Sequence, residues 1–246
     1  MIFQKKKEGF FIKIDKHFFC GYLWERGSRD TNEDSLVFWH IRKGKKHKIM
    51  AVICDGIGGL PLGEEASSYA VRQLANWFTT EGYRLKISKQ KKILQQLCFQ
   101  IHKEIKVFGK EKKIQLGTTI AVVLVENKKI YWFYTGDCRL YLIRNTKVRK
   151  LTKEHHDNKG NLNRAIGIGE WYLLCEDRRR IRKGDRFLLC TDGFYRNLDR
   201  EELRIWGKRK VESDGQADRM LKQIFQKKIN SGERDNISAL YFGYME

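Results

Sequence analysis

The order of strand-like and helix-like segments is the sequence feature that most constrains this fold. Short runs of β-branched and aromatic residues, separated by Gly, Asn or Asp, have the character of strands. The order is strands, two helices, several strands, one helix and a last strand, unlike the strict alternation of a parallel βαβ fold. It predicts an α+β class with helices covering antiparallel sheets. The strands are expected at Phe18–Trp24, Ser35–His40, Lys48–Cys54, Thr118–Val125, Lys129–Thr135, Leu140–Arg144, Trp171–Cys175, Arg186–Cys190 and Ile237–Phe242.

Three amphipathic segments supply the helices of this scheme. Glu64 to Thr80 places apolar residues at helical spacing and has acidic residues in its first turn, where the helix dipole favours them. Ser88 to Phe108 carries one apolar stripe opposite a lysine-rich face, and Asp214 to Asn230 has a similar stripe. Asn127 lies in a short polar turn between two predicted strands, which indicates a hairpin. The apolar stripes predict helices packed on sheets, not a cofactor site.

The composition fits a single cytoplasmic domain over residues 1–246. The chain has one proline, no Ser/Gly-rich linker and no repeat of fixed period. Its six cysteines form no Cys-x-x-Cys pair, which predicts reduced thiols rather than disulfides or zinc ligands. No apolar run reaches the length of a membrane span, and the segment after Lys5–Lys7 is too polar for a signal peptide. We expect a monomer.

The formal net charge of +20 predicts attraction to polyanions or to acidic and phosphorylated partners. The lysines and arginines are spread along the chain, which favours a generally basic surface over a dedicated nucleic-acid site. Two short runs, Arg178–Arg180 and Lys208–Lys210, are typical of solvated faces, and docking sites for acidic substrates remain an alternative reading of them.

Acidic residues stand at the ends of several predicted strands. In an antiparallel pair, the end of one strand lies beside the start of its neighbour, so these positions can meet at one edge of a sheet. Any one Asp-Gly on its own is more often an ordinary turn than a ligand site. The evidence for a site comes from the number of acidic residues at strand ends. Asp55, Asp137 and Asp192 follow strands, whereas Glu33, Asp34 and Asp235 precede them.

So many carboxylates in a small volume require positive charge, because their mutual repulsion would otherwise protonate some of them. Oxygen ligands without matched His or Cys favour Mg²⁺ or Mn²⁺ over Zn²⁺. Arg29, just before the acidic pair, supplies a fork-shaped donor suited to phosphate. The residues alone therefore predict a divalent-cation site that handles a phosphoryl group.

Seven short segments form an ordered set of motifs that runs across almost the whole chain. They are Arg29–Asp34 (R-x-x-N-E-D), Asp55–Gly59 (D-G-x-G-G), Gly117–Thr119 (G-T-T), Gly136–Arg139 (G-D-S-R), Leu151–His155 (L-T-x-D-H), Thr191–Gly193 (S/T-D-G) and Asp235–Asn236 (D-N). The ordered set is far more specific than any one motif. It resembles the type 2C metal-dependent serine/threonine protein phosphatases, especially their short bacterial members.

The resemblance implies a central antiparallel β-sandwich flanked by helices in four layers, α-β-β-α, with two Mg²⁺ or Mn²⁺ ions. By motif, Asp55 bridges both ions and the Gly56 carbonyl serves one of them. Asp192 and Asp235 hold the other, with Glu33 and Asp34 acting directly or through water. Asp137 belongs with Asp192 to a third, weaker metal, and Arg29 binds the substrate phosphate.

The implied reaction is attack by a water bridging the two ions on phosphoserine or phosphothreonine in proteins, in particular the products of a bacterial serine/threonine kinase. Arg29, Asp55 and Asp192 would be its catalytic residues. An alternative reading is a weakly catalytic or regulatory phosphatase-like domain that binds phosphorylated or polyanionic partners.

Two departures from the family pattern affect these expectations. Ile57 stands where some members carry a histidine proposed as general acid, which leaves His155 or a water on a metal as candidates. The stretch from His156 to Ala165 is short where family members usually have a longer flap. A shortened flap would leave the metal edge open and alter substrate selection. His155 and His156 together are more typical of a polar turn than of a ligand pair.

Overall fold

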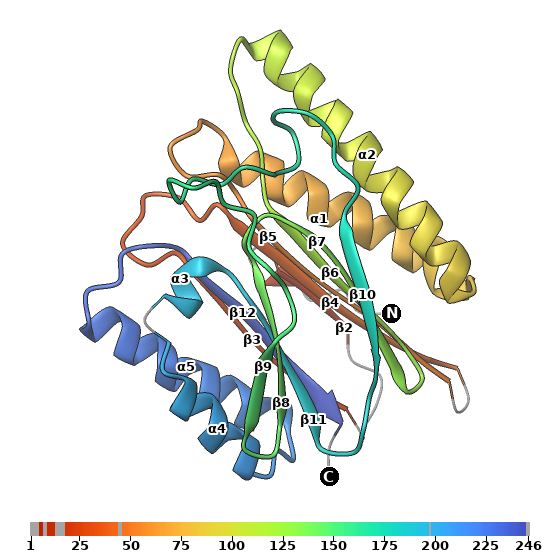
Figure 1. The fold of residues 1–246 in the computed structure, drawn as a ribbon, viewed down its shortest axis with the longest axis vertical. Helices are drawn as coiled ribbons and strands as arrows, with labels where there is room; N and C mark the ends of the chain where they lie inside the picture. The colour runs from red at the N-terminus through yellow and green to blue at the C-terminus, as the bar shows by residue number, and fades with distance from the viewer. Residues whose placement is uncertain (1–4, 7–8, 13–17, 44–45, 197, 245–246) are drawn as a thin grey trace.

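The computed structural model of the chain forms four layers, with two β-sheets packed face to face and helices on both outer surfaces (Figure 1). It describes residues 5–6, 9–12, 18–43, 46–196 and 198–244. Most neighbouring strands are antiparallel, and the pair β2–β4 is parallel. The predicted α-β-β-α architecture is confirmed.

The first sheet has seven strands, and its centre is apolar on both faces because it is covered on both sides. β6 and β7 form the hairpin predicted around Asn127, whose φ of 56° gives the turn its left-handed residue. In spatial order the strands are β1 (Lys5–Lys6), β2 (Gly9–Ile12), β4 (Asp34–Lys43), β5 (Lys46–Asp55), β6 (Ile120–Glu126), β7 (Lys129–Thr135) and β10 (Cys175–Arg180).

The second sheet has five strands and uses the two ends of the chain together. The last strand, β12, lies between the early strand β3 and the late strand β11, so residues about two hundred positions apart in sequence become neighbours. In spatial order the strands are β3 (Phe18–Glu25), β12 (Ile237–Tyr244), β11 (Asp185–Cys190), β8 (Arg139–Arg144) and β9 (Lys147–Lys150).

Helices cover the outer face of each sheet, as their apolar stripes predict. α1 (Gly63–Thr80) and α2 (Ile87–Lys112), joined by the 3-10 turn η1 (Gly82–Arg84), pack on the seven-stranded sheet. α4 (Arg200–Lys208) and α5 (Asp214–Asn230) pack on the five-stranded sheet, and the short α3 (Asp192–Tyr195) precedes them. A third apolar layer fills the space between the two sheets.

The strand predicted at Trp171–Cys175 is wrong. Residues 171–174 form a loop tied to α2, where the Leu174 amide donates to Gln95 Oε1 at 3.0 Å and Gln95 Nε2 donates back to the Leu174 carbonyl. The Trp171 ring packs on Phe99 at 5.5 Å. These contacts with a helix replace strand pairing. The strand begins only at Cys175 and continues through polar residues as β10, which lies at an edge of its sheet.

Two short elements escape hydrophobic patterning. α4 was not predicted, although Asp199 caps it by accepting from the Glu201 amide at 2.8 Å. β9 (residues 147–150) has only one apolar residue, Val148, and lies at an edge of the five-stranded sheet. All six cysteines are free in the structure, and five of them are buried. None of the described helices combines the length and the apolar character that crossing a bilayer requires.

Candidate metal centre

The ends of β4 and β5 place two aspartates side by side. Asp34 begins β4, Asp55 ends β5, and the two residues are direct partners in the antiparallel register. In such a pair the side chains project to the same side of the sheet. Hydrogen bonding across the strands therefore forces two carboxylates together, as the pairing of strand ends predicts.

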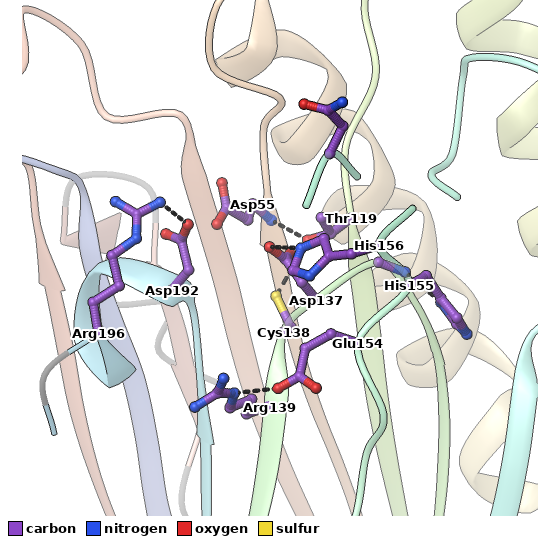
Figure 2. Close-up of polar contacts among 12 residues, drawn as sticks. Asp55, Thr119, Asp137, Cys138, Arg139, Glu154, His155, His156, Asp192 and Arg196 are labelled. Carbon is purple, nitrogen blue, oxygen red and sulfur yellow. Dashed lines mark hydrogen bonds and ion pairs between the residues drawn. The ribbon is translucent and has the colours of Figure 1, made fainter. Parts of the chain in front are cut away.

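Three more aspartates reach the same edge from neighbouring strands, and Figure 2 shows two of them, Asp137 and Asp192, beside Asp55. Asp137 lies in the turn from β7 to β8, Asp192 is the first residue of α3 directly after β11, and Asp235 precedes β12. Their side chains are 14–18% exposed. We call Asp34, Asp55, Asp137, Asp192 and Asp235 together the acidic edge.

Asp34 is the most enclosed member of the acidic edge, with 1% of its surface exposed. Its Oδ2 accepts from the Thr191 hydroxyl at 3.0 Å, and its Oδ1 is buried without a hydrogen-bond partner in the described residues. Burial is the main cause that raises the pKa of Asp34 to about 7, with the charges of Asp192 and Asp235 adding to it. A buried carboxylate oxygen without a partner is costly and is the kind of atom that a cation satisfies.

Asp55 is held by its backbone, which leaves its carboxylate directed into the acidic edge. Its amide donates to Thr119 Oγ1 at 3.0 Å, and its carbonyl accepts from Thr118 Oγ1 at 2.9 Å. Burial raises the pKa of Asp55 well above the usual value. The negative charges of the other four aspartates of the acidic edge raise it further. Asp55 is therefore repelled by all four of the other aspartates.

Arg196, which the sequence reasoning missed, neutralises part of the acidic edge. Its Nη2 pairs with Asp192 Oδ2 and its Nη1 donates to Asp235 Oδ2 at 2.8 Å. Burial raises the pKa of Asp192 to about 6, Arg196 opposes that shift, and Asp137 and Asp235 add to it. Arg196 follows Asp192 by four residues, which is the one signal that could have identified it.

Arg29 and Glu33 flank the acidic edge. Arg29 is half exposed, and its Nη2 lies 2.9 Å from Asp235 Oδ1. The pKa of Glu33 is raised, first by burial and then by Glu64, while Arg29 lowers it. The structure thus brings the predicted phosphate-binding arginine to the acidic edge, where it pairs with a predicted metal ligand.

Two glycines let the loops of the acidic edge approach closely. A Cβ on Gly56 would lie 2.5 Å from the Gly63 carbonyl group, where α1 begins. A Cβ on Gly193 would lie 2.1 Å from the Asn236 carbonyl oxygen. Any larger residue would push apart the segments that carry Asp55 and Asp192, because real Cβ atoms essentially never approach so near.

Asn236 fixes the loop that carries Arg29 and Glu33. Its side-chain Nδ2 donates to the carbonyls of Arg26 and Thr31 at 2.8 and 2.9 Å, and its Oδ1 accepts from the Glu33 amide at 2.9 Å. An amide that both donates and accepts suits this position, whereas a carboxylate cannot donate. The D-N motif includes Asn236, but only the folded structure shows that its side chain holds this loop.

The two adjacent histidines have different environments. His155 stacks on Tyr134 at 5.4 Å, its Nδ1 accepts from the Gly136 amide at 3.0 Å, and its Nε2 lies 3.4 Å from Cys175 Sγ. Both of its ring nitrogens are occupied, so His155 is a poor candidate for the general acid. His156 instead faces the acidic edge, with Nε2 3.4 Å from Asp137 Oδ2 (Figure 2).

The segment predicted as a shortened flap lies in the loop between β9 and β10. A bridge between His156 and Leu162 closes a turn in which Asp157 Oδ1 accepts from the amides of Lys159 and Asn161 at 2.8 and 2.9 Å. A second bridge joins Ile166 to Thr118 next to the acidic edge. The segment is therefore a compact turn of its own.

The residues of the acidic edge fit a hard divalent cation. They offer carboxylate oxygens, one of which is buried without a partner, and their repulsion is relieved only partly by two arginines. Within the described part of the chain, no three acidic, histidine or cysteine side chains are gathered in metal-binding geometry. The guanidinium groups hold Asp192 and Asp235 in this structure.

Comparisons with known proteins agree with the fold and the motifs. The family model described as Protein phosphatase 2C matches residues 26–229. The serine/threonine phosphatase Stp of Listeria monocytogenes is 27% identical over 235 residues, which cover 86% of this chain and 90% of the relative.

Two solved structures share the architecture. A bacterial serine phosphatase has a TM-score of 0.80 at 21% identity, covering 94% of this chain and 98% of that one. The catalytic domain of the serine/threonine protein phosphatase PstP, in complex with two manganese ions, has a TM-score of 0.75 at 22% identity. The alignment with PstP covers 94% of this chain and 99% of that domain.

Proposed function

The chain belongs to the protein phosphatase 2C family, and on this premise we propose that its acidic edge binds two divalent cations and hydrolyses phosphoserine and phosphothreonine in proteins. Its relatives are named serine/threonine phosphatases, which identifies the chain as a protein serine/threonine phosphatase. One observation carries the proposal for the site. The carboxylate of Asp55 meets the negative charges of four other aspartates, all brought to one edge by strand ends.

The ligands fall into two groups by their place in the fold. Asp55 and the Gly56 carbonyl, at the end of β5, would serve one ion, and Asp55 would bridge to the second. Asp192 and Asp235 would hold the second ion from the five-stranded sheet. Glu33 and Asp34 would act directly or through water, and Asp137, at the rim, would serve a third and weaker site.

The cations, when bound, would supply positive charge to the phosphoryl oxygens and acidify the attacking water. Arg29 would orient the phosphate, because its planar fork can bind two oxygens at once and its side chain is half exposed beside the acidic edge. Through its three hydrogen bonds, Asn236 would hold the loop that carries Arg29 and Glu33 against the start of β12.

Mn²⁺ and Mg²⁺ both suit these oxygen ligands, and the manganese in PstP favours testing Mn²⁺ first. We further propose that the substrates are proteins phosphorylated by a bacterial serine/threonine kinase and that the enzyme acts in the cytoplasm as a monomer. Because residues 157–161 form a compact turn, we also propose that the short flap leaves the acidic edge more open to substrates.

The test compares Mn²⁺-dependent hydrolysis of an aryl phosphate and of a phosphothreonine peptide by the wild type and by Asp192→Ala. We expect the variant to lose at least about 10³-fold in kcat/KM on both substrates, because a ligand to the cation is removed. The matched control is Asp199→Ala, which removes an aspartate that caps α4 away from the acidic edge. Absence of metal-stimulated hydrolysis by the folded wild type would refute the proposal and point to a domain that only binds phosphorylated partners.

A further inference from the structure

A second charged region lies at the opposite end of the strands that form the acidic edge. β8 starts two residues after Asp137 and ends at Arg144. β11 starts at Asp185, which pairs with Arg144, and ends two residues before Asp192 (Figure 1). Since a strand rises about 3.3 Å per residue, the six residues of β8 separate the two regions by about 20 Å.

This second region is a cavity of about 660 Å³ whose lining is dominated by basic side chains. Five of its eight lining residues are lysine or arginine, no acidic residue is among the described residues that line it, and its apolar lining residues are Leu142 and Val148. A larger cavity of about 1400 Å³ shares Arg144 and Arg179 with it. We call the five basic residues the basic cleft: Arg144, Lys147, Arg149, Arg179 and Arg204.

Only part of the positive charge in the basic cleft is neutralised. Arg144 donates to both oxygens of the buried Asp185, at 2.5 and 2.7 Å, and Arg204 pairs with Glu201. For Lys147, Arg149 and Arg179, no carboxylate lies within ion-pair distance in the described part of the chain. Among the described residues, these three positive charges therefore line one cavity without a counter-ion.

The basic cleft lies between the edge strands of the two sheets. β9 is an edge strand of the five-stranded sheet and β10 is an edge strand of the seven-stranded sheet. Lys147 and Arg149 are two residues apart and so share one side of β9. Charges on edge strands also prevent pairing with other chains. Charges that point in any direction into solvent would protect an edge strand in this way. Here, however, the charged residues of both edge strands, Lys147 and Arg149 on β9 and Arg179 on β10, line the same cavity.

The chemistry of the basic cleft suits a short acidic peptide better than a nucleic acid. Guanidinium groups bind carboxylates and phosphates through paired hydrogen bonds, and the cavity has the volume of a binding site for a few residues. Single-stranded nucleic acids need exposed aromatic rings on which bases stack. No aromatic residue is among the described residues that line the basic cleft itself. In the larger cavity, Tyr131 is only 5% exposed, while His47 and Tyr244 are half-buried.

We propose that the basic cleft docks an acidic segment of the protein substrate while the acidic edge acts on a phosphorylated residue elsewhere in that substrate. This inference rests on the proposed phosphatase function, because it assumes a protein substrate. An extended chain spans about 3.3 Å per residue, so the acidic segment must lie at least about six residues from the phosphorylated one.

The first test measures binding without catalysis. A fluorescent, glutamate-rich peptide without phosphate is titrated with the full-length protein at about 50 mM salt, with fluorescence anisotropy as the readout. We expect the triple variant Lys147→Ala, Arg149→Ala and Arg179→Ala to bind at least about tenfold more weakly than the wild type, and added salt to weaken the wild type. The control variant, Lys89→Ala, Lys92→Ala and Lys110→Ala, removes the same charge from α2 and should bind like the wild type.

The second test measures kinetics with two phosphothreonine peptides, one with a glutamate-rich block about ten residues from the phosphate and one with a neutral block. The acidic block should lower KM about tenfold and leave kcat unchanged in the wild type and in the α2 control. The triple variant should treat the two peptides alike and hydrolyse an aryl phosphate as fast as the wild type. If the triple variant does not fold, Arg149→Glu alone replaces it, since this exposed side chain has no described partner.

The outcomes separate docking from the phosphatase function. Equal KM for the two peptides in an active wild type overturns docking and leaves the phosphatase function intact. Absence of aryl phosphate hydrolysis overturns the function, whatever the binding result. Equal weakening by the α2 control, or tighter binding of a single-stranded oligonucleotide of the same charge, also overturns the proposed acidic-peptide site.

Discussion

The acidic edge and the basic cleft lie at the two ends of the same strands, and they accommodate charge in different ways. In the acidic edge, five carboxylates share a small volume, Asp34 is almost fully buried, and burial and repulsion raise the pKa of Asp34, Asp55 and Asp192. In the basic cleft, Lys147 and Arg149 are exposed on an edge strand, where water and salt screen their repulsion.

The difference shows what each region can do. Like charges in a buried cluster destabilise the folded chain unless a cation joins them, so the fold itself creates affinity for a metal. Like charges around an open cavity cost little and bind only what is acidic and flexible enough to reach them. One region is therefore expected to supply chemistry, and the other to supply modest and salt-sensitive selectivity.

The largest expected difference between the acidic edge and the basic cleft is in how they affect the pH dependence of stability of the metal-free protein. The folded pKa of Asp34 is about 7 and that of Asp192 about 6, whereas in the unfolded chain both lie near about 4. Between these values the folded protein holds protons that the unfolded chain has released. Raising the pH through this window therefore favours unfolding. We expect the chelator-treated wild type to lose roughly 5–10 °C in Tm between pH 5 and pH 7.5.

Asp34→Asn should reduce this pH dependence, because the neutral amide has no proton to lose and no longer repels Asp55 and Asp192. Arg149→Ala in the basic cleft is the matched control and should keep the wild-type slope. Thermal unfolding followed by circular dichroism in the presence of a chelator gives the answer. If the Tm of the chelator-treated wild type stays constant or rises between pH 5 and pH 7.5, repulsion among the carboxylates of the acidic edge does not destabilise the folded protein.

A smaller effect is expected from Arg196, whose guanidinium bridges Asp192 and Asp235. Because this positive charge opposes a cation at the same carboxylates, Arg196→Met should bind Mn²⁺ about fivefold more tightly, which corresponds to about 1 kcal/mol for a half-exposed pair. Isothermal titration calorimetry measures the affinity. Arg200→Met, which removes an arginine from the start of α4, is the control. Weaker Mn²⁺ binding by Arg196→Met would mean that Arg196 organises the site and does not compete with the metal.

The smallest effect is expected at the basic cleft. Arg149→Glu should change the free energy of unfolding by less than about 0.5 kcal/mol, because its side chain is exposed and has no described partner. Urea unfolding compares this variant with Lys89→Glu on α2. A loss above about 1 kcal/mol for Arg149→Glu alone would show that the basic cleft holds the sheets together, and the contrast with the acidic edge would fail.

The acidic edge was largely predictable because its residues follow from strand periodicity. Once β4 and β5 are recognised, antiparallel register alone pairs Asp34 with Asp55. The outer helices and the hairpin at Asn127 were predictable for the same reason, since their apolar spacing is regular. The roles of the individual ligands came only from the family motifs and remain predictions.

Polar elements and contacts between distant residues were not predictable. β10 carries a polar sequence because it is an edge strand, and the preceding Trp171 packs on α2 instead of joining the sheet. The run Arg178–Arg180 is typical of a solvated face, and only the fold brings Arg179 into one cavity with Arg149 of the other sheet. Arg196 and Asn236 gain their roles from loops that meet in space.

The measurement that tests the central claim most directly is Mn²⁺ binding by calorimetry at about pH 7.5, comparing the wild type with Asp55→Asn. We predict that the wild type binds two ions per chain with a rise in Tm, and that Asp55→Asn loses at least about 100-fold in affinity and most of that rise. Arg149→Ala should bind Mn²⁺ like the wild type. No saturable binding by the folded wild type, or the same binding by Asp55→Asn, would contradict the assignment of the acidic edge as the metal centre.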